Sequence, residues 1–120
     1  MKRILLKLSG EALAGAEKKG FDEATVIAVA KQIRAVAEEG TQIGIVIGGG
    51  NFWRGRTSET INRNKADQIG MLATVMNCIY VSDICRYQIH KYNSDIWDLR
   101  QKSLHHLYVA HSQNFTQKMQ

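Results

Sequence analysis

Two short apolar runs, with an amphipathic stretch between them, form the first part of the chain. Residues 3–8 (RILLKL) and 42–47 (QIGIVI) are nearly continuous apolar segments, typical of strands buried on both faces of a parallel sheet. Between them, apolar residues recur at three- and four-residue spacing, which predicts a helix that Asp22 caps and Gly40 ends. We therefore predict a strand–helix–strand unit with parallel strands and a right-handed crossover.

Parallel strands of such a unit end at the same edge of the sheet. The first strand is followed by Ser9 and Gly10, and the second by residues 48–50, which are all glycine. Ligands of open α/β sheets bind beyond the carboxyl ends of the strands. We therefore expect these two segments to meet at a ligand-binding edge.

A second helix is predicted from Asp67 towards Arg86. Its apolar residues cover most of its circumference, which is typical of a core helix or of an interface between subunits. Gly70 lies inside this helix and is costly there unless another backbone approaches closely. From Tyr87 onward the pattern gives no convincing strand, and only a weak helix is suggested between residues 96 and 108.

The amino-acid composition is compatible with many classes of soluble protein and excludes only a few. The chain has 120 residues, the size of one domain, and its 44% hydrophobic and 22% charged residues are ordinary for a soluble protein. No apolar run approaches the roughly 18–20 residues that span a bilayer, and Lys7 interrupts the N-terminal run too early for a signal peptide. We expect a cytoplasmic protein that does not bind membranes. The net charge of +5 suits an anionic ligand, whereas the scattered lysines and arginines argue against nucleic acid.

The cysteines and histidines indicate no metal site. Cys78 and Cys85 lie seven residues apart, about 10 Å along a helix, which is too far for a disulfide. We predict buried free thiols. His105, His106 and His111 lack the spacing of metal ligands, and no Cys or Asp cluster accompanies them.

The stretch VIGGGNFWRGR, residues 46–56, is the main candidate site. Three glycines after a strand allow backbone N–H groups to converge on phosphate oxygens, and a helix beginning near Asn51 would add its dipole. The alternative is a tight turn that needs a positive φ, for which one glycine would be sufficient. The spacing matches neither a Walker A loop nor a G-x-G-x-x-G fingerprint.

Charged residues near this stretch are further candidates. Lys7 would be costly to bury without an anion, although it can also extend from a strand end to solvent. Arg54 can clamp a phosphate, as can Arg56 and Arg63, and composition does not choose among the three. Asp67 either caps a helix or accepts hydrogen bonds from ribose hydroxyls.

The segments KRILLKLSGEAL, GIVIGGGNFWRGR and ADQIGMLATVMN resemble, in order and spacing, those of bacterial uridylate kinases, within the amino-acid-kinase superfamily. The resemblance implies a three-layer α/β/α fold with a mainly parallel sheet. It also implies transfer of the γ-phosphoryl group of ATP to UMP, with Mg²⁺ bound to the nucleotide. The family further implies a cytoplasmic homohexamer, with a GTP effector response that carries over only weakly to residues 15–21.

The resemblance implies roles for individual residues as well. Lys7 and Arg54 would be catalytic, by neutralising charge on the transferred phosphoryl group. The implied contacts with ATP are those of Lys7, Leu8, Ser9, Gly10, Gly50 and Arg54. The implied contacts with UMP are those of Gly49 and Asp67.

The resemblance covers residues 1–86, about the first third of a family member, and residues 87–120 show no correspondence. The sequence therefore predicts the N-terminal part of an amino-acid-kinase-like domain, followed by an unrelated tail that is disordered or arises from a shifted reading frame. A truncated chain of this kind would lack the adenine-binding half, so we expect no turnover. The alternative is a non-catalytic nucleotide- or anion-binding fragment whose tail serves interaction. A small nucleic-acid binder has weaker support, because basic and aromatic residues are not interleaved.

Overall fold

The computed structural model describes residues 2–54 and 59–92, with side chains described up to Gln88. The elements in chain order are strand β1 (Arg3–Leu8), the 3₁₀ turns η1 (Gly10–Leu13) and η2 (Gly15–Glu17), helix α1 (Glu23–Glu38), strand β2 (Gln42–Ile47) and helix α2 (Arg63–Tyr92). The two strands pair in parallel, in a register that runs from Arg3 opposite Gln42 to Leu8 opposite Ile47. The predicted strands and their parallel pairing are confirmed.

Helix α1 begins and ends at the residues that the sequence predicts. The Asp22 carboxylate accepts a hydrogen bond from the N–H of Thr25 at 3.1 Å and so caps the first turn. Gly40 follows the helix with a φ of 87°, a left-handed conformation that glycine adopts without a steric penalty. These two local signals confine α1 to the connection between the strands.

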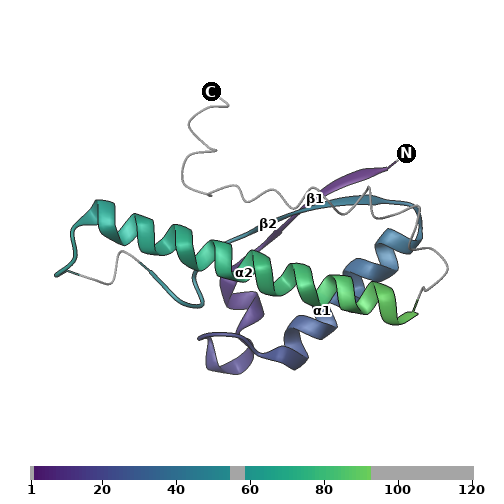
Figure 1. The fold of residues 1–120 in the computed structure, drawn as a ribbon, viewed down its shortest axis with the longest axis horizontal. Helices are drawn as coiled ribbons and strands as arrows, with labels where there is room; N and C mark the ends of the chain where they lie inside the picture. The colour runs from purple at the N-terminus through teal and green to yellow at the C-terminus, as the bar shows by residue number, and fades with distance from the viewer. Residues whose placement is uncertain (1, 55–58, 93–120) are drawn as a thin grey trace.

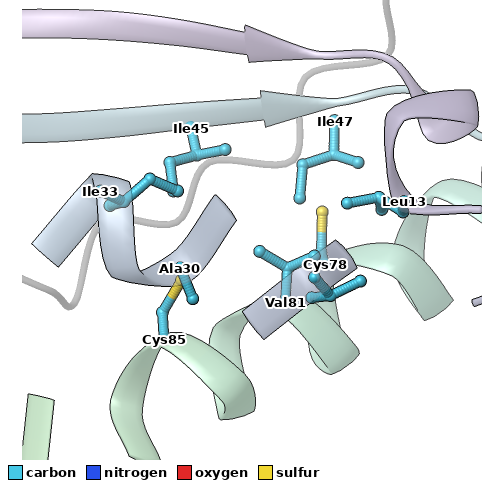
Figure 2. Packing of buried hydrophobic residues seen from close by; sticks show 9 residues of the cluster. Leu13, Ala30, Ile33, Ile45, Ile47, Cys78, Val81 and Cys85 are labelled. Carbon is cyan, nitrogen blue, oxygen red and sulfur yellow. The ribbon is translucent and has the colours of Figure 1, made fainter. Parts of the chain in front are cut away.

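Both helices pack on the same face of the two-stranded sheet (Figure 1). Figure 2 shows side chains of β2, α1 and α2 meeting in one apolar cluster under the sheet. The buried members of the cluster are Leu13, Val26, Ala30, Ile33, Ile45, Ile47, Cys78, Val81 and Cys85. Removal of this apolar surface from water is the main force that holds α2 against the strand–helix–strand unit.

The opposite face of the sheet is uncovered in the part of the chain that the structure describes. Leu5 is 71% exposed, and Lys7 on the same face is exposed as well, because side chains alternate along a strand. The expectation that the first strand is buried on both faces is therefore wrong for the described residues, since α1 and α2 share one face. The α/β class is confirmed, while residues 2–54 and 59–92 form no layer on the second face.

Helix α2 is longer than predicted at both ends. The backbone carbonyl of Asn62 accepts from the N–H of Ala66 at 2.9 Å, and its side chain accepts from the N–H of Asn64 at 2.9 Å. Asn62 therefore lies at the helix start, and Asp67 lies more than one turn inside. The interpretation of Asp67 as a cap is wrong, because a polar residue earlier in the chain already starts the helix. The weak helix suggested at residues 96–108 lies outside the described residues.

One described segment, Arg63–Gln88 of α2, is long and apolar enough to cross a bilayer by length and composition. The sequence expectation that no stretch meets these criteria is wrong. In this fold 33% of the segment's most apolar window is buried inside the structure, and its buried residues include the polar Thr74, Asn77 and Gln88. The side-chain amide of Asn77 forms hydrogen bonds with Gly48 and Asn51, so this part of α2 packs against the rest of the described fold.

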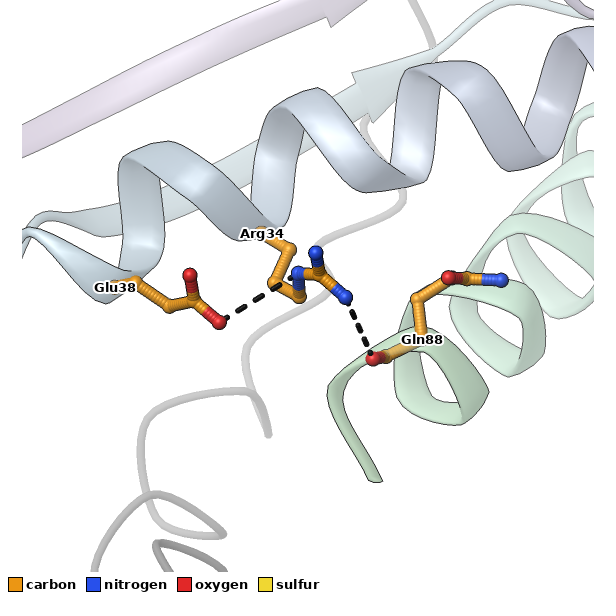
Figure 3. Close-up of polar contacts among 3 residues, drawn as sticks. All are labelled: Arg34, Glu38 and Gln88. Atoms are coloured by element: carbon orange, nitrogen blue, oxygen red, sulfur yellow. Dashed lines mark hydrogen bonds and ion pairs between the residues drawn. The ribbon is translucent and has the colours of Figure 1, made fainter. Parts of the chain in front are cut away.

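Arg34 connects the two helices at the end of α1. Its guanidinium forms an ion pair with Glu38 at 3.5 Å and donates a hydrogen bond to the backbone carbonyl of Gln88 at 3.4 Å (Figure 3). A carboxylate near a helix C-terminus is unfavourable for the helix dipole, and the neighbouring cation offsets this cost. The same guanidinium stabilises the packing of α1 against the late turns of α2.

Cys78 and Cys85 are free and buried, as the sequence predicts. Burial raises the pKa of both thiols, that of Cys85 from 9.0 to about 11. Both thiols are therefore protonated at neutral pH and are poor nucleophiles or metal ligands. They act as small apolar residues of the core.

The backbone segments that follow the two strands lie in direct contact. The N–H of Gly48 donates to the carbonyl of Leu8 at 3.0 Å, one residue beyond the paired strands. A Cβ atom placed on Gly10 would lie 2.6 Å from the backbone nitrogen of Gly50 and 2.8 Å from the carbonyl oxygen of Gly48. Only glycine fits at position 10, and the predicted meeting of the two segments at one edge is confirmed.

This contact predicts different effects for two Gly→Ala substitutions. Gly10→Ala is expected to lower the free energy of unfolding by about 2 kcal/mol or more, because backbone atoms rather than a flexible side chain would have to move. Gly48→Ala is the matched control, since its Cβ would lie 3.6 Å or more from any neighbour. Urea denaturation followed by circular dichroism measures both values. Equal effects of the two substitutions would contradict the close approach at Gly10.

Candidate functional site

The glycine loop, residues 48–51, follows β2 at the edge where both strands end (Figure 1). None of its three glycines has a φ in the left-handed region. The interpretation of the triplet as a tight turn that needs a positive φ is therefore wrong. Close approach of other groups accounts for the missing side chain at Gly49, whereas a Cβ at Gly48 or Gly50 would make only ordinary contacts, at 3.6 Å and 3.7 Å.

Gly49 is required by the packing of α2. A Cβ atom on Gly49 would lie 3.0 Å from the carbonyl oxygen of Gly70 and 3.1 Å from the Cβ of Ala73. Among the described residues, a Cβ atom on Gly70 itself would meet only Cδ1 of Trp53, at 3.6 Å, so the expectation that a backbone approach requires glycine at position 70 is wrong. The contact requires glycine at position 49 instead. This contact is a reason for glycine that the sequence analysis did not consider, because it depends on how α2 packs against the loop.

Gly50 lies next to an ion pair. A Cβ atom on Gly50 would lie 3.7 Å from Nη2 of Arg54 and 3.8 Å from Cγ of Glu11. The guanidinium of Arg54 pairs with the carboxylate of Glu11, and their side chains are 55% and 46% exposed. Arg54 is thus the arginine beside the glycine loop, whereas Arg63 begins α2 and Arg56 lies outside the described residues.

The loop is followed by a single turn rather than by a helix. The N–H groups of Phe52 and Trp53 both donate to the carbonyl of Gly49 at 3.1 Å. The expectation of a helix beginning near Asn51 is therefore wrong for the described residues 51–54, which supply no helix dipole to the loop. Among the residues that the structure describes, the N–H groups of Gly49 and Gly50 have no hydrogen-bond partner. They are therefore candidate donors for an anion.

Lys7 lies near the same edge of the sheet, on its uncovered face. Its register partner is Val46, two residues before Gly48, and its side chain is exposed while that of Leu8 packs against the core cluster. The argument from the cost of burying Lys7 is therefore wrong, because no element covers this face in the described residues. Lys7 nevertheless lies in β1 two residues before Ser9, and its partner Val46 lies two residues before the loop.

Ser9 holds the segment between β1 and the loop contact. Its hydroxyl accepts a hydrogen bond from the N–H of Ala12 at 3.2 Å and caps η1. Gly10, the first residue of η1, is the residue that touches the glycine loop. The hydroxyl of Ser9 therefore orients the backbone on one side of the site.

Asp67 lies on the face of α2 that approaches the loop. Asp67, Gly70 and Thr74 follow each other at three- and four-residue spacing, so they share one face of the helix. A Cβ atom on Gly49 would lie 3.0 Å from the carbonyl oxygen of Gly70, 3.1 Å from the Cβ of Ala73 and 3.2 Å from the backbone nitrogen of Thr74. Asp67 is half-buried, one turn before this contact.

Phe52 anchors the end of the loop to the core through aromatic contacts. Its ring meets that of Phe21 edge-on, with centroids 5.1 Å apart, and Phe21 stacks on Tyr80 of α2 at 3.9 Å. Burial raises the pKa of Tyr80, and the carboxylate of Glu23 adds to the effect. The tyrosine is neutral at physiological pH and serves packing here.

Asn51 and Asn77 are the residues of the site that the sequence analysis missed. They form a buried pair of side-chain amides between the glycine loop and α2. The available signal was an amide among the mainly apolar residues of the second helix, in TVMNCIY. Sequence alone gives no partner for it, because the pair spans 26 residues of chain.

Comparison with known proteins shows what this arrangement resembles. The model of the amino acid kinase family matches residues 2–119. The uridylate kinase of Fervidobacterium nodosum is 52% identical over 82 residues, which is 68% of this chain and 35% of that protein. The uridylate kinase of Thermosipho melanesiensis is 49% identical over 83 residues, 69% of this chain and 36% of the relative.

Solved structures of UMP kinases share the fold. The UMP kinase of Bacillus anthracis gives a TM-score of 0.67 at 38% identity, over 72% of this chain and 36% of that chain. The UMP kinase of Ureaplasma parvum gives a TM-score of 0.67 at 31% identity, over 73% of this chain and 39% of that chain. The chain thus spans little more than a third of the length of these relatives. It belongs to the amino acid kinase family.

Proposed function

We propose that the glycine loop binds nucleotide phosphates and serves in transfer of the γ-phosphoryl group of ATP to UMP, which gives ADP and UDP. The main support is that the N–H groups of Gly49 and Gly50, which have no partner among the described residues, lie beside the guanidinium of Arg54 at the carboxyl ends of two parallel strands. Phosphoryl transfer depends on alignment and on neutralisation of charge rather than on a protein nucleophile. The residues around the loop are suited to those two tasks.

The ATP phosphates would lie over the loop, between its two cations. Lys7 would approach from the uncovered face of the sheet and Arg54 from the side of Gly50, so that positive charge flanks the transferred group. The proposed contacts with ATP are those of Lys7, Leu8, Ser9, Gly10, Gly50 and Arg54. Lys7 and Arg54 would be catalytic residues, because charge on the phosphoryl oxygens increases as the transfer proceeds.

UMP would lie on the α2 side of the loop. Gly49 faces this helix, and Asp67 lies one turn before their contact on the same helix face. A carboxylate at this position would accept hydrogen bonds from the ribose hydroxyls. Gly49 and Asp67 are therefore the proposed UMP contacts.

Mg²⁺ would be carried by the nucleotide. Within residues 2–54 and 59–92, no three His, Cys, Asp or Glu side chains gather to hold a metal ion. This arrangement fits a cation that phosphate oxygens and water coordinate, as is usual for Mg²⁺ in kinases. Its contribution when bound would be to neutralise charge on the phosphates.

The alternative is binding of nucleotides or other anions without turnover. The matched segment is 35–36% of the length of the curated relatives. The absence of turnover expected from the sequence stays a prediction. So do the cytoplasmic location, the lack of membrane and nucleic-acid partners, the GTP effector, and the division into residues 1–86 and 87–120.

We also propose that the chain forms a homo-oligomer through the outer face of α2. Leu72 and Ile79 are 65% and 67% exposed, and Val75 and Met76 between them are exposed as well. An apolar stripe of this kind favours a second copy as its cover. Sedimentation velocity should show association that increases with concentration and that Leu72→Glu weakens. A chain that remains monomeric at all concentrations would contradict this proposal.

Removal of either cation tests the proposed function. Lys7→Ala and Arg54→Ala are each expected to weaken binding of Mg²⁺–ATP about 10- to 100-fold, the effect of losing a charge-assisted hydrogen bond. Isothermal titration calorimetry measures the affinity, and a coupled assay for UDP shows whether turnover accompanies it. Lys31→Ala, which removes an exposed lysine of α1, is the matched control. Equal affinity in all four proteins would refute the assignment of these residues.

A substitution of Glu11 is expected to strengthen binding of Mg²⁺–ATP, the opposite of the effect expected for Lys7 and Arg54. Its carboxylate pairs with Arg54, so it competes with any anion that binds the same guanidinium. Glu11→Gln keeps the shape and removes the charge, and it is expected to tighten binding of Mg²⁺–ATP about two- to five-fold, as for an exposed ion pair. Glu39→Gln, at the end of α1, is the control for net charge. Weaker binding by Glu11→Gln would show that the carboxylate takes part in binding instead.

A further inference from the structure

The glycine loop is fixed at both ends by one buried amide of α2. Asn77 is fully buried, and Asn51 is 3% exposed. The Nδ2 group of Asn77 donates to the carbonyl of Gly48 at 2.7 Å and to Oδ1 of Asn51 at 2.7 Å. Asn51 returns a hydrogen bond from its own Nδ2 to Oδ1 of Asn77 at 3.1 Å. The first and last residues of the loop are therefore bound to the same side chain.

Asn51 also forms hydrogen bonds with the segment that precedes α1. Its Nδ2 group donates to the carbonyl of Gly20 at 2.9 Å, and the N–H of Gly20 donates to the backbone carbonyl of Asn51 at 2.9 Å. Together with Asn77, these bonds connect the loop to two separate elements. Gly49 and Gly50, which lie between the fixed ends, have no side chains of their own to hold them.

The amide of Asn77 is not needed simply to fill space. An apolar side chain of similar size would occupy the same position on the inner face of α2 without burying polar atoms. Both Nδ2 hydrogens and the Oδ1 of Asn77 are instead used within the protein, so the group is not left for a ligand. Its three hydrogen bonds all end on the first or last residue of the loop.

We propose that Asn77 is a positioning residue, which acts through Asn51 to hold the N–H groups of Gly49 and Gly50 in place before an anion binds. This inference rests on the proposed function, since it assigns the loop a phosphate to receive. A run of three glycines has a large conformational freedom, and its loss opposes binding. Hydrogen bonds that restrict the loop beforehand reduce this cost and preorganise the donors.

The test replaces the buried amide and measures the loop and the ligand separately. Asn77→Leu keeps the volume and removes the three hydrogen bonds. The control is Gln88→Leu, which removes a buried amide from the same helix at a position remote in sequence from the loop contacts. Backbone ¹⁵N relaxation gives order parameters for Gly49 and Gly50, calorimetry gives the affinity for Mg²⁺–ATP, and thermal melting shows whether each chain is folded.

The expected result for folded Asn77→Leu is a fall of both order parameters from about 0.85 to below about 0.6, with roughly tenfold weaker Mg²⁺–ATP binding. Gln88→Leu should leave both readouts unchanged. Unchanged order parameters, or a mobile loop with unchanged affinity, would overturn the proposal. If Asn77→Leu does not fold, Asn51→Ala gives the same comparison with the same deciding outcomes. A wild-type chain that binds no nucleotide contradicts the proposed function alone, because the order parameters still decide whether Asn77 holds the loop.

Discussion

The parallel register of β1 and β2 is the constraint on which the rest of the structure depends. Because Leu8 lies opposite Ile47, the segments that leave the two strands start side by side, and Gly10 contacts the backbone of Gly48 and Gly50. The register itself is held by burial of only one face of the sheet, against α1 and α2. A slip of one residue would turn the buried isoleucines of β2 to solvent and would also separate the two glycine segments. Core packing and site geometry are thus fixed by the same pairing.

The site is built mainly from backbone atoms, and the structural surroundings of each glycine are different. Gly10 makes room for the loop, Gly49 makes room for α2, and Gly50 lies open beside Arg54. Side chains contribute at the periphery, where Arg54 lies beside Gly50 and the exposed Lys7 lies on β1, two residues before Ser9. This division suits phosphate recognition, since amide donors fix geometry and the outer charges supply long-range attraction.

The parts of the fold that sequence predicts well are those set by local signals. Asp22 and Gly40 delimit α1 through contacts within a few residues, and the two apolar runs match the strands to the residue. The start of α2 was misplaced because asparagine and aspartate are about equally good caps, and the apolar pattern of the helix begins only after Asp67. The exposure of Lys7 and the pairing of Glu11 with Arg54 depend on tertiary arrangement. The hydrogen-bonded pair of Asn51 and Asn77 depends on tertiary arrangement too. The periodicity of the sequence does not reveal which residues pair across such distances.

The most direct measurement of the central claim is a titration of the ¹⁵N-labelled chain with Mg²⁺–ATP, followed by the backbone amide resonances of its ten glycines. If the strand ends form one phosphate-binding edge, the amides of Gly10, Gly49 and Gly50 will shift together with a single affinity, while that of Gly40, beyond α1, will not move. Shifts confined to other glycines, or separate affinities for Gly10 and Gly50, would contradict the account.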